Sequence, residues 1–358
     1  MISLLDRLIA RQILYSTLLV LNVLVALAVF FVMISALRDY GEANFGLVEL
    51  IKYVVLRQPQ QVYDLAPIAA LIGTIMGLST LALNSELTAM RASGVSVARI
   101  VLATMKVGLV FALAVLLLGE YVVPTSENLA QIGRARALQT PLQKKSSGIW
   151  LRSGTMYVNI GEVLPDLSLL RMNIYDFDQN SRLRTQTSAR RAHYDDGVWR
   201  LHKVSESLIV GDQKVQTRRV PEAEWSSALT PEVVSVFAVQ PDSLSIVQLH
   251  YYIGHLELNN QDTRSFRLAF WQKCFMPLAI LVMVLLATPF VFRQIRSGGL
   301  SQRIFIGIML GMVFIIFHKT LGYFGALYAL PPVAATLLPM TVFFVLALFL
   351  LRRAARGL

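Results

Sequence analysis

The residue types that catalyse reactions are present in this sequence, but not at the spacings that catalysis requires. The histidines show no metal-ligand spacing, and His250 and His255 are five residues apart, which places them off one helical face. No phosphate-binding Gly-x-x-x-x-Gly-Lys-Ser/Thr loop, Gly-x-Gly-x-x-Gly motif or Gly-x-Ser-x-Gly nucleophile elbow occurs. The single cysteine, Cys274, cannot form a disulfide within the chain. We therefore do not expect an enzyme, and energy for any work should come from another subunit.

One short polar segment has the pattern of a contact site for such a subunit. Ser85 is placed to cap a helix at about 84–94, and Glu86 would lie at its positive end. Leu87 and Met90 would form a small apolar face, and Gly94 can end the helix. This pattern fits a cytoplasmic coupling helix that docks on an ATPase. It fits equally well an interfacial linker in which Glu86 is a solvated partner of the helix dipole.

Six long apolar stretches dominate the chain, three on each side of a polar block of about 140 residues. They cover roughly 13–37, 62–82, 99–123, 270–291, 304–324 and 331–351. A helix needs about 20 residues to cross ~30 Å of hydrocarbon, so each stretch is long enough. The sequence predicts an α-helical membrane protein in which 1–123 and 270–358 each supply three transmembrane helices. Residues 124–269 form the domain inserted between them.

Arginines near the ends of the stretches predict the orientation. If the N-terminus is cytoplasmic, the short outer segments contain only Arg38, Lys52 and Arg57. The short inner segments contain Arg7, Arg11, Arg91, Arg99, Arg293, Arg296, Arg303, Arg352, Arg353 and Arg356. This bias predicts that both termini are cytoplasmic and that the inserted domain is outside the cytoplasm. The formal net charge of +11 then needs no nucleic-acid partner, because arginines beside anionic lipid account for much of it.

The inserted block has the two-residue period of β-strands. Leu170, Met172 and Ile174 alternate with polar residues, and a second run at 198–204 follows the turn at 195–197. Further turns are expected at 179–181, 211–212 and Pro221. Several short strands separated by such turns are typical of a sandwich or jelly roll. A more helical segment, 243–258, should follow.

Pairs of glycines occur four residues apart in two of the apolar stretches. Gly73 and Gly77 fall in the second stretch, and Gly307 and Gly311 fall in the fifth. This spacing lets helix backbones approach closely in lipid. We expect ordinary helix packing at these positions, with a sliding or gating contact as the alternative.

Several segments resemble the lipopolysaccharide-export permeases of the LptF/LptG family. The first two are Ser85-Glu86-Leu87-Thr88-Ala89-Met90-Arg91-Ala92-Ser93-Gly94 and Gly119-Glu120-Tyr121-Val122-Val123-Pro124. The later ones, which resemble the LptG branch, are Leu229-Thr230-Pro231, Pro241-Asp242-Ser243-Leu244-Ser245-Ile246 and Leu330-Pro331-Pro332. The resemblance covers almost the whole chain.

The resemblance implies one permease of an ABC-type transporter in a Gram-negative inner membrane. Its expected partners are an LptF-like permease, an LptB-like cytoplasmic ATPase dimer and an LptC-like protein with a single membrane helix. ATP and Mg would be bound by the ATPase, and no cofactor is expected in this chain. The complex would extract lipopolysaccharide and pass it to a periplasmic bridge toward the outer membrane. The inserted domain would be a periplasmic jelly roll, and Glu86, with Leu87, Met90, Arg91 and Gly94, would belong to the coupling helix.

A lipopolysaccharide site needs cations for phosphates above an apolar wall for acyl chains. Arg38, Arg134 and Lys319 are the expected phosphate contacts, and Arg134 aligns with a basic position of the family. Arg38 has the alternative of snorkelling to the lipid surface, and Lys319 has the alternative of a lysine that only reaches the interface. The resemblance implies a cluster of basic residues near the end of the first stretch. This sequence has Met33 and Ser35 where lysines would be expected.

The expected acyl-chain wall consists of Phe30, Phe31, Phe314 and Phe317, with the alternative that such aromatic residues only face lipid or neighbouring helices. Arg303 is a possible gating or lipid-facing residue, although the positive-inside rule already explains an arginine at that place. Two other functions stay open on the sequence alone. One is an ion-coupled secondary transporter, which needs ionisable groups at mid-membrane depth. The other is a passive scaffold for a periplasmic assembly.

Overall fold

The computed structural model describes residues 4–139, 149–153, 155–164, 168–178, 182–195, 197–210, 214–226, 241–258, 262–292, 300–327 and 331–356. Several features singled out above lie outside these ranges. They are the turns at 179–181 and 211–212, the segment 229–231, Asp196, Arg293, Arg296 and Leu330.

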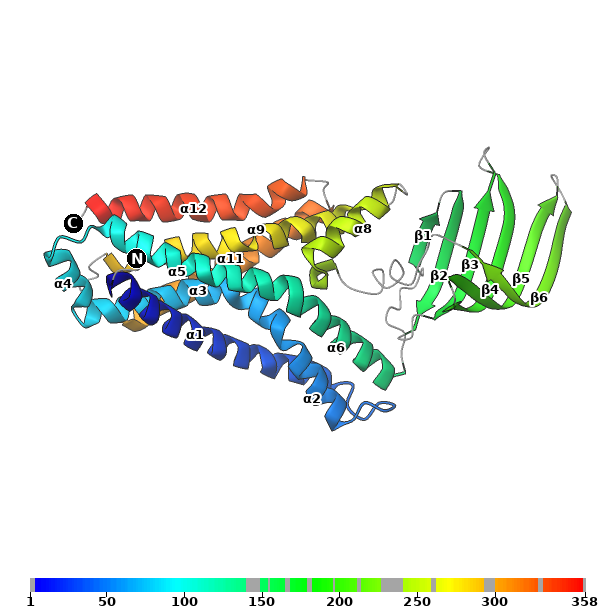
Figure 1. Cartoon of the computed structure of the whole chain (residues 1–358), viewed down its shortest axis with the longest axis horizontal. Coiled ribbons are helices and arrows are strands. Elements are labelled where there is room, and N and C mark those ends of the chain that lie inside the picture. Colours follow the sequence, from blue (N-terminus) through cyan, green and yellow to red (C-terminus); the bar gives the residue numbers. More distant parts are fainter. Residues whose placement is uncertain are drawn as a thin grey trace. The chain divides into compact units, whose positions relative to one another are not determined.

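Six helical stretches in the described part of the chain are long and apolar enough to cross a membrane, as the sequence predicts. They are built from α1 (Leu4–Leu37), α2 (Leu47–Leu56) with α3 (Gln58–Leu83), α5 (Val97–Leu117) with η1 (Leu118–Val122) and α6 (Val123–Ala137), α9 (Arg264–Ala287) with α10 (Pro289–Phe292), α11 (Leu300–Leu327) and α12 (Pro332–Arg356). Two shorter helices are α4 (Glu86–Ala92) and α8 (Ile246–Leu258) (Figure 1).

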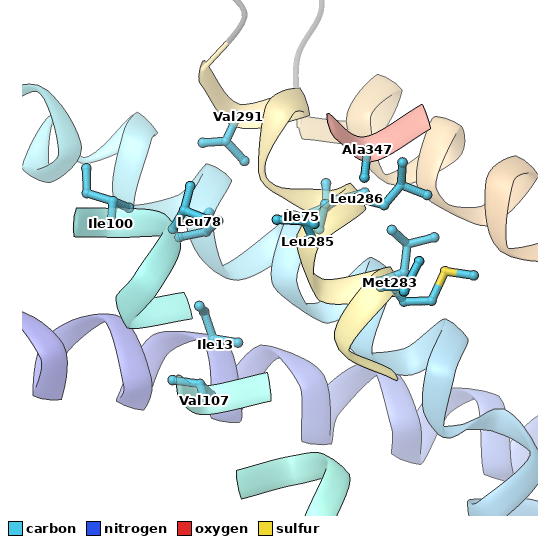
Figure 2. Packing of buried hydrophobic residues seen from close by; sticks show 14 of the residues in the cluster. Ile13, Ile75, Leu78, Ile100, Val107, Met283, Leu285, Leu286, Val291 and Ala347 are labelled. Atoms are coloured by element: carbon cyan, nitrogen blue, oxygen red, sulfur yellow. The ribbon is translucent and has the colours of Figure 1, made fainter. Parts of the chain in front are cut away.

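The chain divides into two compact units, each with its own packing. The first comprises Met1–Ile34, Arg57–Pro124 and Arg267–Leu358, and the second comprises Ser35–Leu56 and Thr125–Phe266. Apolar side chains from α1, α3, α5, α9 and α12 form one buried cluster in the first unit. Figure 2 shows part of this cluster, in which Ile13, Leu78, Ile100 and Leu286 come from four of these helices.

Small residues bring α1 and α3 into close contact. A Cβ added at Gly73 would overlap Thr17 of α1. A Cβ at Gly77 would come within 3.0 Å of the Cα of Ile13. The predicted packing role of this glycine pair is therefore confirmed, because only hydrogen leaves room for the α1 backbone here.

The second glycine pair makes room on α11 for isoleucine side chains of α3. A Cβ at Gly307 would lie 2.8 Å from Cδ1 of Ile75, and one at Gly311 would lie 3.0 Å from Cγ2 of Ile68. Helix α3 thus receives α1 and α11 at separate glycine contacts, and it is the most enclosed span in the chain, with 78% of its most apolar window buried.

The third span continues as a helix beyond the predicted boundary at 123. Pro124 lacks the N–H that would donate to the carbonyl of Glu120, and its ring would crowd that carbonyl. The helix widens into the π turn η1 immediately before the proline and then resumes as α6, which ends at Ala137. The π turn relieves the conflict, so the proline does not end the helix.

The inserted domain contains a six-stranded antiparallel sheet in the order β1-β2-β3-β4-β5-β6 (Figure 1). The strands are β1 (Ile149–Ser153), β2 (Met156–Val163), β3 (Leu169–Phe177), β4 (Leu183–Asp195), β5 (Val198–Val210) and β6 (Lys214–Trp225). The predicted class, membrane helices with an inserted all-β domain, is confirmed. Each described strand pairs with its neighbours in sequence, so these six form a meander without the crossing connections of a jelly roll.

One face of the sheet is a hydrophobic core. Met172 and Ile174 are buried, as the alternation along β3 predicts, but Leu169 and not Leu170 is in the core, because the backbone at Arg171 has φ 53° and shifts the alternation there. Trp199 of β5 is fully buried beside Tyr194. Asp195 ends β4 and Gly197, with φ +85°, precedes β5, and Asp195 pairs with Val198, as the predicted turn between two runs requires. The predicted helical segment 243–258 begins with a short 3-10 turn, η2 (Pro241–Ser243), and continues as α8.

Candidate functional site

Helix α4 forms where the sequence predicts a coupling helix, but its start differs from the prediction. Ser85 adopts a left-handed conformation with φ 61° and its side chain makes no capping hydrogen bond. The expected serine cap is therefore wrong, because the extended backbone that such a cap uses is absent. Glu86 is the first residue of α4, where a carboxylate is favoured by the helix dipole. Its Oε2 atom is buried and accepts no hydrogen bond from any described residue.

The end of α4 follows the prediction at Gly94. This glycine has φ +89°, and its N–H donates to the carbonyl of Arg91 over 3.0 Å. The N–H of Val95 donates to the carbonyl of Met90, also over 3.0 Å. These two hydrogen bonds define a Schellman motif. Its left-handed position is occupied by Gly94, because glycine adopts a positive φ without steric strain.

The side chains of α4 divide between the bundle and the surface. Leu87 is buried within the apolar cluster of the first unit, and Met90 packs against that cluster. Arg91 and Gly94 are exposed. The apolar face of α4 therefore anchors the helix to its own bundle, and its polar face is the part available to another protein.

Arg303 lies near the start of α11 and reaches α3. Its Nη1 atom donates to Oγ of Ser79 over 3.4 Å. Its Nε atom is buried and has no hydrogen-bond partner among the described residues. Arg303 thus lies between two packed helices and is only partly exposed to the surroundings.

Arg134, on α6, has two partners within the second unit. Its Nε atom donates to Oδ2 of Asp39 over 2.9 Å, and Nη2 donates to the same oxygen. The guanidinium carbon also lies 5.3 Å from the centre of the Tyr53 ring of α2, which is a cation–π contact. Asp39 is in the turn that follows α1, so the ion pair joins that turn to α6.

The other two predicted phosphate contacts are exposed. Arg38 is next to Asp39 in the same turn, so the structure brings it close to the Arg134 ion pair. Lys319 lies on α11 in the first unit, and its side chain is also exposed.

The four predicted acyl-chain contacts have two different environments. Phe30 and Phe31 of α1 are 53% and 59% exposed and contact each other edge to face. Phe314 of α11 is buried, with the Phe343 ring of α12 at 5.1 Å. Phe317 packs against the same apolar cluster. Of these four side chains, Phe30 and Phe31 are the exposed pair in this conformation, whereas Phe314 is covered by the bundle itself.

An ionic cluster on α1 and α5 is absent from the sites predicted from the sequence. Asp6 is buried, and its carboxylate lies 3.4 Å from Nη2 of Arg99 and 3.0 Å from Nζ of Lys106. The available signal was an acid in the first turn of a membrane helix, where a partner is expected. These contacts hold the start of α1 against α5.

A second missed residue is Lys273 in α9. Only 4% of it is exposed, and its Nζ atom lies 5.4 Å from the centre of the Tyr63 ring of α3. Gly119 in the π turn contacts the same ring so closely that a Cβ there would overlap it. A lysine in an apolar stretch is itself a signal, but its aromatic partner is 210 residues away in sequence and has no local pattern.

Comparison with known proteins relates these features to a family. The profile of the family described as lipopolysaccharide export system permease LptF/LptG matches residues 7–353. This chain belongs to the LptF/LptG family. It is 34% identical over 352 residues to the lipopolysaccharide export system permease protein LptG of Escherichia coli (strain K12), covering 98% of both chains. It is 33% identical over 356 residues to LptG of Haemophilus influenzae (strain ATCC 51907 / DSM 11121 / KW20 / Rd), covering 99% of both.

The family match includes every predicted site residue. It covers α4, the Arg134–Asp39 pair, the phenylalanines of α1 and α11, and the whole described sheet. Membership of this family also agrees with the architecture, in which helices long and apolar enough to cross a membrane precede and follow the inserted β domain in the sequence.

Proposed function

We propose that this chain is one of two permease subunits of an ABC-type lipopolysaccharide exporter. The observation that supports the proposal is similarity to two LptG proteins along practically their whole lengths, with all six spans and the β insertion present. The chain would lie in the inner membrane with both termini in the cytoplasm and the sheet in the periplasm, as the arginine bias favours.

The energy source in this proposal is a cytoplasmic ATPase dimer that binds ATP and Mg. Helix α4 would dock on it through Glu86, Arg91 and the exposed side of the helix. Leu87 belongs to the same buried cluster as Ile9 of α1 and Ile100 of α5. Packed interiors transmit displacement because they contain few voids. A push on α4 would therefore move the spans that contact Leu87.

The substrate path in this proposal uses the cations and apolar surface described above. Arg38, Arg134 and Lys319 would contact phosphates, and Phe30 and Phe31 would contact acyl chains. Phe314 and Phe317 would join them only if α11 moves, since both pack inside the bundle here. The partner permease would supply the other wall, and a single-span periplasmic protein would receive the lipid.

Reversing the charge at Glu86 tests the proposal. We expect Glu86→Lys to abolish co-purification of the ATPase with the tagged membrane complex and to remove lipopolysaccharide-stimulated ATP hydrolysis. The matched control is Glu49→Lys, because Glu49 is a solvent-accessible acid in the first turn of α2. This control should retain both properties.

Retention of both properties in Glu86→Lys would contradict the coupling role of α4. A complex that keeps its ATPase but transports without hydrolysis would favour ion-coupled secondary transport. The passive-scaffold function would be favoured if the unmodified complex holds its periplasmic partners but does not move lipopolysaccharide.

A further inference from the structure

The face of the sheet opposite its core carries a groove at β1, β2 and β3. Its volume is about 520 Å³, within the range of roughly 300–1,000 Å³ that small-molecule sites occupy. It is lined by Trp150, Arg152, Thr155, Tyr157, Tyr175, Phe177 and Asp178. None of these residues has a part in the transport path proposed above.

Strand register brings the groove residues together. Arg152 of β1 pairs with Tyr157 of β2, and Tyr157 pairs with Tyr175 of β3. Directly paired residues point to the same side of a sheet, and their neighbours along each strand point to the other. Leu151 and Val158 accordingly lie in the hydrophobic core, so the groove side chains are on the opposite face.

The groove has aromatic rings at its surface and hydrogen-bonding groups beside them. Trp150 and Tyr175 are stacked, with ring centres 5.8 Å apart and planes 19° from parallel. Trp150 is 53% exposed, which is a large apolar area to leave in water. The Arg152 guanidinium lies 5.3 Å from the centre of the Tyr157 ring.

We propose that this groove binds saccharide, specifically the sugar headgroup of the exported lipopolysaccharide. The inference rests on the proposed function for the source of the sugar. A pyranose ring presents C–H groups on its faces and hydroxyl groups at its edge. The faces match exposed aromatic rings, and the hydroxyls both donate and accept hydrogen bonds.

The polar lining distinguishes saccharide from a proline-rich peptide, which also binds aromatic grooves. Arg152 supplies donors only, Asp178 supplies acceptors only, and Thr155 and the tyrosines supply hydroxyls of both kinds. Asp178 already accepts the backbone N–H of Arg182 through Oδ1, and a further hydrogen bond would come from a ligand that donates. A proline-rich segment offers mainly carbonyl acceptors, whereas sugar hydroxyls both donate and accept, so a sugar makes fuller use of this mixed lining. The sugar contacts would hold the headgroup at the β domain, separately from the contacts to phosphate and acyl chains.

The test uses the full-length chain in its complex, reconstituted in lipid nanodiscs. The probe is the acyl-free core oligosaccharide released from lipopolysaccharide by mild acid, titrated by calorimetry. We expect saturable binding, weakened roughly five- to tenfold by Trp150→Ala, the loss expected for one aromatic stacking surface. Trp150→Phe should recover most of the affinity. Arg152→Gln, which keeps every ring, should also weaken binding and serves if Trp150→Ala fails to fold.

Tyr251→Ala is the matched control, because Tyr251 is a 64% exposed aromatic residue on α8, outside the groove. It should bind the oligosaccharide as the unmodified chain does. No oligosaccharide binding, or binding unaffected by both groove variants, would overturn the inference. So would loss of a partner protein from the Trp150→Ala complex with sugar binding intact. The proposed function is tested separately by asking whether sugar-poor lipid A stimulates ATP hydrolysis in the same nanodiscs. This stimulation does not need sugar bound in the groove.

Discussion

At the level of single residues, the pairing of Arg134 with Asp39 changes how a phosphate site here should work. Both hydrogen-bonding nitrogens of Arg134 donate to one carboxylate oxygen of Asp39, and Tyr53 covers the guanidinium. The two side chains are 35% and 18% exposed, so the pair is only partly screened by water. A phosphate that binds Arg134 must therefore share the guanidinium with Asp39 or replace it.

Removing the charge of Asp39 should make Arg134 a better ligand for phosphate. We expect Asp39→Asn to raise the affinity of the complex for bisphosphorylated lipid A by about 1 kcal/mol, roughly fivefold. Thermophoresis of labelled complex in nanodiscs would measure the change. Glu42→Gln, at an exposed acid in the same turn, should leave the affinity unchanged.

Arg134→Ala gives the opposite limit, since it should weaken lipid A binding. If Asp39→Asn weakens binding as much as Arg134→Ala does, then the pair serves to hold the turn against α6 and the competition described here is wrong. Higher salt should narrow the difference between Asp39→Asn and the unmodified chain, because screening weakens both the ion pair and the phosphate contact.

At the level of helices and strands, the contact of α1 with α3 depends on the absence of one methyl group. Gly73→Ala places a Cβ on top of Thr17, and the backbone of α1 must then move away. We expect a loss of about 1–3 kcal/mol of stability, the usual cost of overpacking. Scanning fluorimetry of the detergent-solubilised complex should show a lower unfolding temperature.

The comparison with Gly254 makes the test specific. A Cβ at Gly254 of α8 would meet no atom within 4 Å among the described residues. Gly254→Ala should raise stability by up to about 1 kcal/mol, because alanine has less freedom to lose in a helix. If both alanines shift the unfolding temperature in the same direction, the close approach of α1 and α3 is not what Gly73 provides.

The sequence predicted the elements better than their ends and contacts. Long apolar runs and the alternation along β3 are local patterns, and they located the spans and the sheet correctly. The third span was expected to end at 123, but the helix continues through a π turn into α6. Ser85 indicated a cap, but its backbone turns left-handed. Both predictions failed for the same physical reason. The conformation that the residue type favours was outweighed by the backbone conformation of the adjacent turns of the chain.

Contacts between distant segments were beyond single-residue patterns. The pairs Lys273–Tyr63 and Asp39–Arg134 join segments whose approach depends on how the helices pack. Phe314 illustrates the same difficulty, because an apolar residue in a membrane span can face lipid or its own bundle. The glycine pairs were the exception, since a residue without a side chain predicts a close contact without identifying the partner.

At the level of the whole molecule, the candidate spans differ clearly in how much of each is buried by the rest of the chain. Only 17% of the most apolar window of α1 is buried, and the same holds for α11, whereas α3 is largely enclosed. An apolar helix face can stay in contact with lipid at no cost. Where it carries small or aromatic side chains, it can also pack against a second subunit. The spans with the least internal packing are those that a partner permease or a lipid substrate can contact without unfolding the bundle.

The orientation of the whole chain is the last property that can be tested. Arginines favour a cytoplasmic α4 and a periplasmic sheet, because moving them across the membrane during insertion is unfavourable. Cysteines introduced by Ser93→Cys and Arg184→Cys, at exposed positions after α4 and in β4, report the two sides. The background is Cys274→Ser, so no other thiol remains. A membrane-impermeant maleimide should label the Arg184→Cys chain in intact spheroplasts and the Ser93→Cys chain only after lysis.

The reverse labelling pattern would invert the molecule and remove α4 from reach of a cytoplasmic ATPase, whatever Glu86 contributes. The Cys274→Ser chain without added cysteine serves as the blank in both conditions. Since α4 is anchored through Leu87 to the cluster that joins α1, α3, α5, α9 and α12, its side of the membrane also decides from which compartment force can enter the bundle. Labelling of Ser93→Cys from the cytoplasmic side, together with labelling of Arg184→Cys from the periplasmic side, would therefore place the input of energy and the groove on opposite sides of the membrane, as export requires.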